Sequence, residues 1–164
     1  MQDFISLFKF DQSKAGCVGI ERERFIVDQN GQPIAKANDV LNLLPDNGKF
    51  GYELSACQLE DRVGPININQ VREHLWSNDQ KIKAALEQLN LQQAFMEVGP
   101  EDMTLEVYDD PTGRYQQIVQ NMPQDKLSAA CRVAGTHVHV GMPDISTALR
   151  VYNYVATRWE ILCN

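Results

Sequence analysis

Short extended patterns rich in β-branched residues recur along the chain. The segments predicted to be strands are residues 17–28, 49–60, 95–98 and 131–141. The first and the last are the clearest, because valine and isoleucine favour extended backbone. Asn30-Gly31 predicts a turn after the first strand, and Gly64-Pro65 is expected to end the second extended stretch, which starts at residue 49.

Helical periodicity separates these strands. The longest helical pattern covers residues 68–92, where apolar residues recur at intervals of three and four, and the polar triplet 77–79 is a candidate break. Residues 37–44 predict a short helix with its cap near Asn38-Asp39, stopped by Pro45.

Two further helices are predicted in the last third of the chain. One is expected to begin at Thr112, with an apolar side formed by Tyr115, Ile118, Val119 and Met122. The other follows a cap at Asp144, and its apolar stripe consists of Ile145, Leu149, Tyr152, Ala156 and Trp159. Strands in mixed order with helices between them predict an α+β fold, with a mostly antiparallel sheet and helices on one face.

The size and charge of the chain narrow the class of protein. A length of 164 residues without repeats or linkers suits a single domain over residues 1–164. The 22 acidic and 15 basic residues give a formal net charge of −7, and no cluster of lysine and arginine indicates nucleic-acid binding. An acidic chain still binds anionic ATP when its carboxylates first hold Mg²⁺.

The sequence lacks the signals of several other classes of protein. No apolar run approaches the roughly 20 residues that cross a bilayer, and the first residues do not resemble a signal peptide, so we expect a cytoplasmic protein without a membrane segment. The 4 cysteines form no CxxC pair, which disfavours a zinc knuckle. Motifs of dinucleotide-binding folds, P-loop NTPases, zincins and α/β-hydrolases are also missing from the sequence.

Glu21 and Glu23 form the first candidate site. On a strand, residues two apart point to the same face, so the two carboxylates would lie side by side. Like charges at that distance repel unless a cation lies between them, and clustered oxygen ligands suit Mg²⁺. The alternative is a solvated strand face with alternating charges, Glu-Arg-Glu-Arg, and spacing alone favours that alternative.

His137 and His139 form the second candidate pair, again on one face of a predicted strand. Gly135 and Gly141 flank them and allow another group to approach closely. Two such histidines either bind a metal or phosphate or transfer protons, whereas the structural alternative is a pair of hydrogen-bonded sheet residues. Their position between glycines favours a functional role.

Glu53 and Glu60 are a weaker pair. Their separation is odd, so a plain strand would place them on opposite faces, and a bulge or a turn between them is needed to bring them together. Arg114 with Tyr115 is a further candidate for ligand binding, although the pattern favours a place for Tyr115 on the apolar side of its helix.

Taken in order, these segments resemble the glutamate–cysteine ligases of family 2. Residues 19–23 (Gly-Ile-Glu-Arg-Glu) are similar to the first strand of that family, and residues 53–60 to its second acidic element. Residues 132–141 resemble its Gly-x-His-Val-His-Val-Gly strand, and Arg114-Tyr115 lies where the family often has Arg-Tyr. The resemblance covers roughly residues 17–160.

The resemblance implies a glutamine-synthetase-like fold whose sheet holds Mg²⁺ and ATP. It implies metal ligands at Glu21, Glu23, Glu53, Glu60 and His137, with cofactor contacts from His137 and His139 and no assigned catalytic residue. The family reaction uses ATP to convert the γ-carboxylate of glutamate into an acyl phosphate, which an amine then displaces. The implied partners are therefore ATP, a glutamate-like amino acid and an amine, in the pathway of glutathione biosynthesis.

Members of the family are longer than this chain, and their second half supplies further metal and phosphate contacts. Some also carry a glutamate at the position of Ala56. We therefore expect the chain to represent the N-terminal part of a longer ligase domain, and to form a homo-oligomer or associate with the missing C-terminal half.

Two other functions remain open. One is a Mg-nucleotide or amino-acid binding module without catalytic activity. The other is a small metalloenzyme in which His137, His139 and one carboxylate form a facial triad for a transition metal.

Overall fold

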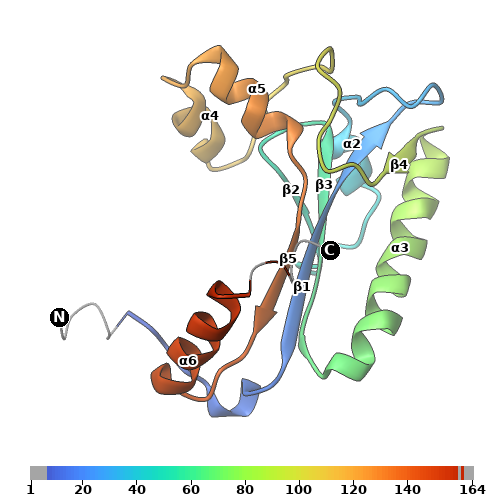
Figure 1. Ribbon diagram of the computed structural model, residues 1–164. Helices are drawn as coiled ribbons and strands as arrows, with labels where there is room; N and C mark the ends of the chain where they lie inside the picture. The colour runs from blue at the N-terminus through green and yellow to red at the C-terminus, as the bar shows by residue number, and fades with distance from the viewer. Residues whose placement is uncertain (1–6, 159, 161–164) are drawn as a thin grey trace.

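A computed structural model describes residues 7–158 and 160. At its centre is a five-stranded antiparallel sheet (Figure 1). The strands are β1 (Val18–Val27), β2 (Phe50–Tyr52), β3 (Gln58–Ile66), β4 (Gln92–Ala94) and β5 (Thr136–Val140). β2, β3 and β1 follow one another, and the other side of β1 pairs first with β5 and then with β4. β1 is therefore the central strand.

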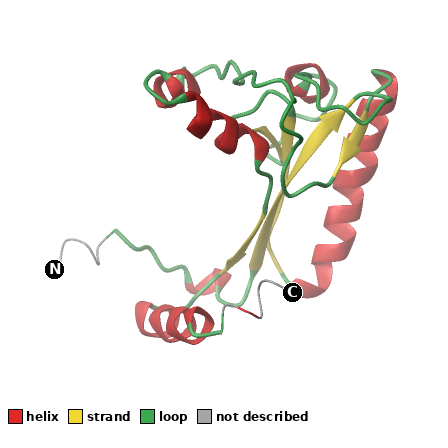
Figure 2. Cartoon of the chain, turned by 45° about the horizontal axis from the view of Figure 1, so that its top comes forward, coloured by secondary structure: helices red, strands yellow, loops and turns green. Residues whose placement is uncertain are grey.

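The helices are distributed on both sides of the strands (Figures 1 and 2). They are η1 (Gln12–Lys14), α2 (Ala37–Leu41), η2 (Ile68–Gln70), α3 (Val71–Gln88), α4 (Arg114–Val119), α5 (Gln124–Arg132) and α6 (Ile145–Ala156). α2 and α3 pack against β2, β3 and β4, and they form the predicted helix layer. The α+β class and the antiparallel sheet are confirmed.

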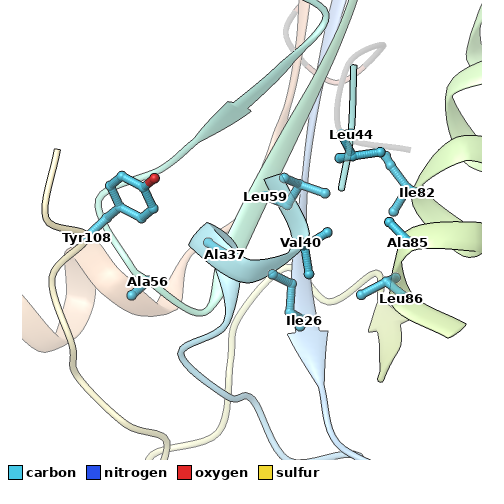
Figure 3. Close-up of a cluster of buried hydrophobic side chains, with 10 residues drawn as sticks. All are labelled: Ile26, Ala37, Val40, Leu44, Ala56, Leu59, Ile82, Ala85, Leu86 and Tyr108. Carbon is cyan, nitrogen blue, oxygen red and sulfur yellow. The ribbon is translucent and has the colours of Figure 1, made fainter. Parts of the chain in front are cut away.

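The main hydrophobic core lies between the sheet and α3. Ile26 of β1 and Leu59 of β3 pack with Ile82 and Leu86 of α3, and Val40 of α2 completes the contact (Figure 3). Each of these side chains is at most 2% exposed. The alternation along the strands explains this arrangement, because every second residue faces the helix.

A polar network lies beside this core. Arg24 and Asp61 are fully buried and form an ion pair, and Asp61 also pairs with Arg22 at 3.0 Å. Asp79 of α3 accepts hydrogen bonds from both arginines, at 2.7 Å and 3.0 Å. A buried charge is tolerated when it is paired and hydrogen-bonded, and here the two guanidinium groups face two carboxylates.

This network also explains why α3 continues where the sequence indicated a candidate break. Asn78 is 1% exposed, and its Nδ2 donates to Asp61 at 3.0 Å and to the Arg62 carbonyl at 3.2 Å. Asn78 and Asp79 of the polar triplet therefore contact buried charges. Tertiary hydrogen bonds replace the local contacts with which such residues interrupt helices.

The extended region after residue 49 differs from the prediction in two ways. It is divided into β2 and β3 by a turn within residues 53–57, and β3 continues through Gly64-Pro65 to Ile66. The Gly64-Pro65 peptide bond is cis, and Gly64 has a φ of 100°. A Cβ at Gly64 would lie 2.4 Å from the Val18 carbonyl oxygen, so only glycine allows β1 and β3 to approach so closely here.

The prediction for residues 131–141 was wrong in its first part. Residues up to Arg132 belong to α5, and the strand begins only at Thr136. Asp125 in the first turn and Arg132 in the last turn complement the helix dipole, a signal that the sequence contained. The prediction for residues 95–98 was also displaced, because the strand there is Gln92–Ala94.

Other element boundaries agree closely with the prediction. β1 occupies the first predicted strand, α2 ends before Pro45, and α4 begins two residues after Thr112. Asp144 caps α6, where its side chain accepts from the Thr147 amide at 2.7 Å. Trp159, placed in the stripe of α6 by the sequence, lies outside the described residues. Within the described chain, none of the helices is long and apolar enough to cross a membrane.

The buried ion pairs generate a prediction about stability. Replacing Arg24→Met should lower the free energy of unfolding by about 3 kcal/mol, because Asp61 would remain buried with one counter-charge fewer. Urea unfolding followed by circular dichroism would measure this change.

A matched control is Lys83→Met, which removes the exposed ion pair between Lys83 and Glu87 on α3. The control should change the free energy of unfolding by less than about 0.5 kcal/mol. Equal effects of the two substitutions would show that the buried network does not stabilise the fold.

Candidate metal centre

The candidate site lies on the face of the sheet opposite α3. Strand alternation sends Arg22 and Arg24 toward α3, so Glu21 and Glu23 of β1 point the other way. In the antiparallel ladder Glu23 lies directly opposite Glu60 of β3. Glu21 lies opposite His137 of β5 on its other side. Sheet register alone therefore aligns four of the predicted residues across three strands.

Glu53 reaches the same site from the turn between β2 and β3. A carboxylate oxygen of Glu53 lies within 4.8 Å of carboxylate oxygens of Glu23 and Glu60, so the three carboxylates are neighbours. The turn over residues 53–57 reverses the chain, and this removes the difficulty of the odd spacing between Glu53 and Glu60. All five predicted metal-ligand positions are therefore brought together.

Two groups of ligand atoms are compact enough for a metal ion. The first consists of Glu21, Glu60 and His137, and the second of Glu23, Glu53 and Glu60, with ligand atoms of each group within 4.8 Å of one another. Glu60 belongs to both groups. The arrangement therefore offers two adjacent positions bridged by one carboxylate.

His139 lies beside the first group. Its Nε2 is 3.1 Å from Glu21 Oε2, and His137 Nδ1 is 3.4 Å from the same oxygen. These contacts lower the pKa of Glu21, with the hydrogen bond from His139 as the largest cause. Among the described residues, His137 belongs to the first group of ligand atoms, the second group consists of glutamates alone, and His139 belongs to neither.

The buried carboxylates are electrostatically unfavourable without a cation. Burial, followed by the charges of Glu60 and Glu23, raises the pKa of Glu53 to about 8. Burial also raises the pKa of Glu60, which is only 4% exposed. A divalent cation among these oxygens would reverse the repulsion, and hard oxygen ligands suit Mg²⁺. The donor set therefore fits that ion.

Arg62 belongs to the site, although the sequence patterns did not predict it. It lies opposite Glu21 in the ladder, forms an ion pair with Glu60, and has its Nε 3.9 Å from Glu21 Oε1. Gly51 provides the space for it, because a Cβ at Gly51 would lie 2.9 Å from the Arg62 guanidinium. Its position two residues after Glu60 on a strand is the signal that placed it on this face.

A pocket of about 590 Å³ has Arg114 and Arg62, the ion-pair partner of Glu60, in its wall. Tyr52 stacks on Tyr108 with ring centroids 4.3 Å apart, and Tyr115 meets Tyr52 edge-on at 5.8 Å. The two alternatives for Tyr115 are thus compatible, because it packs against the core and also lines the pocket.

Asp110 holds the segment that carries Arg114 and Tyr115. Its carboxylate accepts from the Tyr115 amide at 2.7 Å and from the amide and the hydroxyl of Thr112. These hydrogen bonds, led by that from the Thr112 hydroxyl, lower the pKa of Asp110 to about 2. The charged form of Asp110 therefore fixes one wall of the pocket.

Comparison with known proteins identifies the family. The family model described as "Glutamate-cysteine ligase family 2 (GCS2)" matches residues 17–160, nearly the whole chain. The chain belongs to this family. Membership agrees with the antiparallel sheet and with a glutamine-synthetase-like fold, and it confirms the resemblance seen in the sequence.

Individual relatives carry the same name. A protein of Mycobacterium sp. (strain KMS), "Putative glutamate--cysteine ligase 2-2", is 31% identical over 140 residues, which are 83% of this chain and 37% of the relative. A protein of Rhodococcus jostii (strain RHA1) with the corresponding name, numbered 2-1, is 28% identical over 149 residues, or 88% of this chain and 39% of the relative. The chain thus spans well under half the length of these relatives.

The role of Asp110 generates a prediction about pH. Its folded-state pKa of about 2 lies below the ordinary value of 3.8, so the stability it contributes is present above pH 3.8 and is lost as the pH falls through about 2. Asp110→Asn should therefore unfold at lower urea concentration than the wild type at pH 7, and the difference should shrink toward pH 2.

The measurement is a series of urea midpoints between pH 2 and pH 7 for both proteins. Asp102→Asn, in the preceding loop, is a suitable control, since Asp102 is exposed. A difference between wild type and Asp110→Asn that stays constant over this range would contradict the assigned role of the charge.

Proposed function

We propose that this chain forms the N-terminal part of an ATP- and Mg²⁺-dependent carboxylate–amine ligase of the glutamate–cysteine ligase type. One observation carries the proposal: four carboxylates and His137 converge on one sheet face, in two groups that share Glu60, in a chain of this ligase family. Family membership supports a ligase-like role, and the geometry supports the metal dependence.

The proposed metal ligands are Glu21, Glu60 and His137 at one position and Glu23, Glu53 and Glu60 at the other. Bound Mg²⁺ would neutralise phosphate charge during transfer of the terminal phosphate of ATP to a substrate carboxylate. The protein contributes a rigid sheet on which the ligands are already aligned. His139 hydrogen-bonds to Glu21 and orients that carboxylate next to the first position.

The neighbouring pocket suits the organic substrates. Arg62 and Arg114 provide two permanent positive charges for carboxylates of an amino acid, and the tyrosines provide flat apolar surface. Arg62 also adjoins the carboxylate cluster, so a substrate held by it would lie next to the proposed metal positions. The acceptor is proposed only as an amine.

A second candidate function is a binding module that holds Mg-nucleotide without turnover. The observation that supports it is the same carboxylate cluster, since two metal positions on one sheet face suffice to hold a Mg-nucleotide. The facial-triad metalloenzyme is less well supported, because the compact groups of described residues are rich in carboxylates and contain one histidine at most.

Calorimetric titration with Mg-ATP tests the proposed site. Wild-type protein should bind, Glu60→Gln should bind at least about tenfold more weakly because both positions lose a ligand, and excess EDTA should abolish binding. Glu87→Gln is the control, since Glu87 lies on α3 with its side chain 65% exposed.

Equal binding by wild type and Glu60→Gln would refute the assigned metal centre. If wild type binds Mg-ATP, release of ADP in the presence of glutamate and a panel of amines then separates the ligase from the binding module. Binding without any turnover would favour the module.

A further inference from the structure

Arg62 places a positive charge on the carboxylates of the candidate metal centre. Its guanidinium forms an ion pair with Glu60, and its Nε lies 3.9 Å from Glu21 Oε1. Glu21 and Glu60 are two of the three members of the first ligand group, and Glu60 also belongs to the second. A guanidinium and a divalent cation on the same carboxylates repel each other. Arg62 is therefore a built-in competitor of a metal ion at the first position.

The side chain of Arg62 can change its partner without a rearrangement of the sheet. Its amide donates to the Lys49 carbonyl at 2.7 Å, and its carbonyl accepts from Asn78 Nδ2 at 3.2 Å, so the backbone is held on both sides. The side chain, in contrast, is 44% exposed, whereas that of Glu60 is 5% exposed. Exposed side chains change rotamer within nanoseconds. Release of the ion pair therefore moves Arg62 and leaves Glu60 in place.

Arg62 also lies between two pockets. It contributes to the wall of the 590 Å³ pocket and to that of a second pocket of about 420 Å³, which Glu21 and His139 also line. In the described part of the chain, the two linings have Arg62 alone in common. Its guanidinium lies against Gly51, which belongs to the larger pocket, since a Cβ at Gly51 would be 2.9 Å from Arg62 Nη2. A guanidinium that leaves Glu60 thus has a ligand pocket directly beside it.

We propose that Arg62 is a switch that couples metal binding to binding of the substrate carboxylate, an inference that rests on the proposed function. Arg62 releases Glu60 and Glu21 when the first metal position is filled. Its guanidinium then binds a carboxylate of the amino-acid substrate in the larger pocket, beside Arg114. Because the released charge gains a new partner in the substrate, the metal and the amino acid strengthen each other's binding.

A purely supporting role for Arg62 leads to the opposite expectation. An arginine that only orients Glu60 would help this carboxylate to bind a metal, so its removal would weaken Mg²⁺ binding. A competitor weakens Mg²⁺ binding while it is present, so its removal strengthens that binding. The sign of the change in Mg²⁺ affinity therefore separates the two roles.

Calorimetric titration of the 164-residue chain with Mg²⁺ measures this sign. Arg62→Gln should bind Mg²⁺ about fivefold or more tightly than the wild type, and Arg62→Lys, which keeps the charge, should return the affinity toward the wild-type value. Arg72→Gln is the matched control, because it removes the same charge from an exposed position on α3 and should leave the affinity unchanged. Circular dichroism establishes that each variant is folded.

The coupling is measured with L-glutamate as the probe. The wild type should bind L-glutamate about fivefold or more tightly in saturating Mg²⁺ than in EDTA, and Arg62→Gln should lose this difference. In the wild type, the NMR signal of the Arg62 Nε–H group should shift over the same range of Mg²⁺ concentration, because its partner changes.

Unchanged or weaker Mg²⁺ binding by Arg62→Gln would overturn the switch and leave the metal centre standing. L-glutamate binding that Mg²⁺ does not strengthen in the wild type, or strengthens equally in Arg62→Gln, would also overturn the switch. If Arg62→Gln does not fold, the wild-type signal decides, since an Arg62 Nε–H signal unchanged at saturating Mg²⁺ contradicts release. Absence of Mg²⁺ binding by both folded proteins would instead refute the metal centre itself, and the switch with it.

Discussion

The alternation of charge along β1 is the constraint on which the rest of the structure depends. Glu21 and Glu23 face one side of the central strand, and Arg22 and Arg24 face the other. The arginines are neutralised beneath α3 by Asp61 and Asp79, which ties the helix to the sheet. The charges of the arginines are thus compensated. The glutamates on the opposite face instead have other carboxylates as neighbours.

On the carboxylate face, the fold therefore holds groups of like charge close together. Glu53 and Glu60 are partly or fully withdrawn from water, and the pKa of each is raised. Arg62 and the histidines offset part of this repulsion from its margins. Arrangements of this kind persist where a bound cation completes the charge balance, and they are typical of functional sites.

The distribution of burial divides the protein into two parts. Between α3 and the sheet, apolar side chains are buried together, and Arg24 Nη1 and Asn78 Nδ2 donate hydrogen bonds to carboxylates. At β5 and α6, side chains of the same apolar types remain in solvent. The candidate metal centre lies between these parts, with ligands from the buried strand β3 and from the exposed strand β5. The protein therefore buries the metal centre on the side of β3 and leaves it exposed to solvent on the side of β5.

Local sequence determined β1, the N-cap of α6 and the shared face of Glu21 and Glu23, because strand alternation and capping act over a few residues. The motifs also identified the ligase family, which the family match confirmed. Only the tertiary structure decided that the turn after Glu53 joins it to Glu60, that Arg62 adjoins them, and that Asn78 continues α3 rather than breaking it. These outcomes depend on contacts between segments that are distant in sequence. Periodicity and propensity describe only neighbouring residues, so they do not predict such contacts.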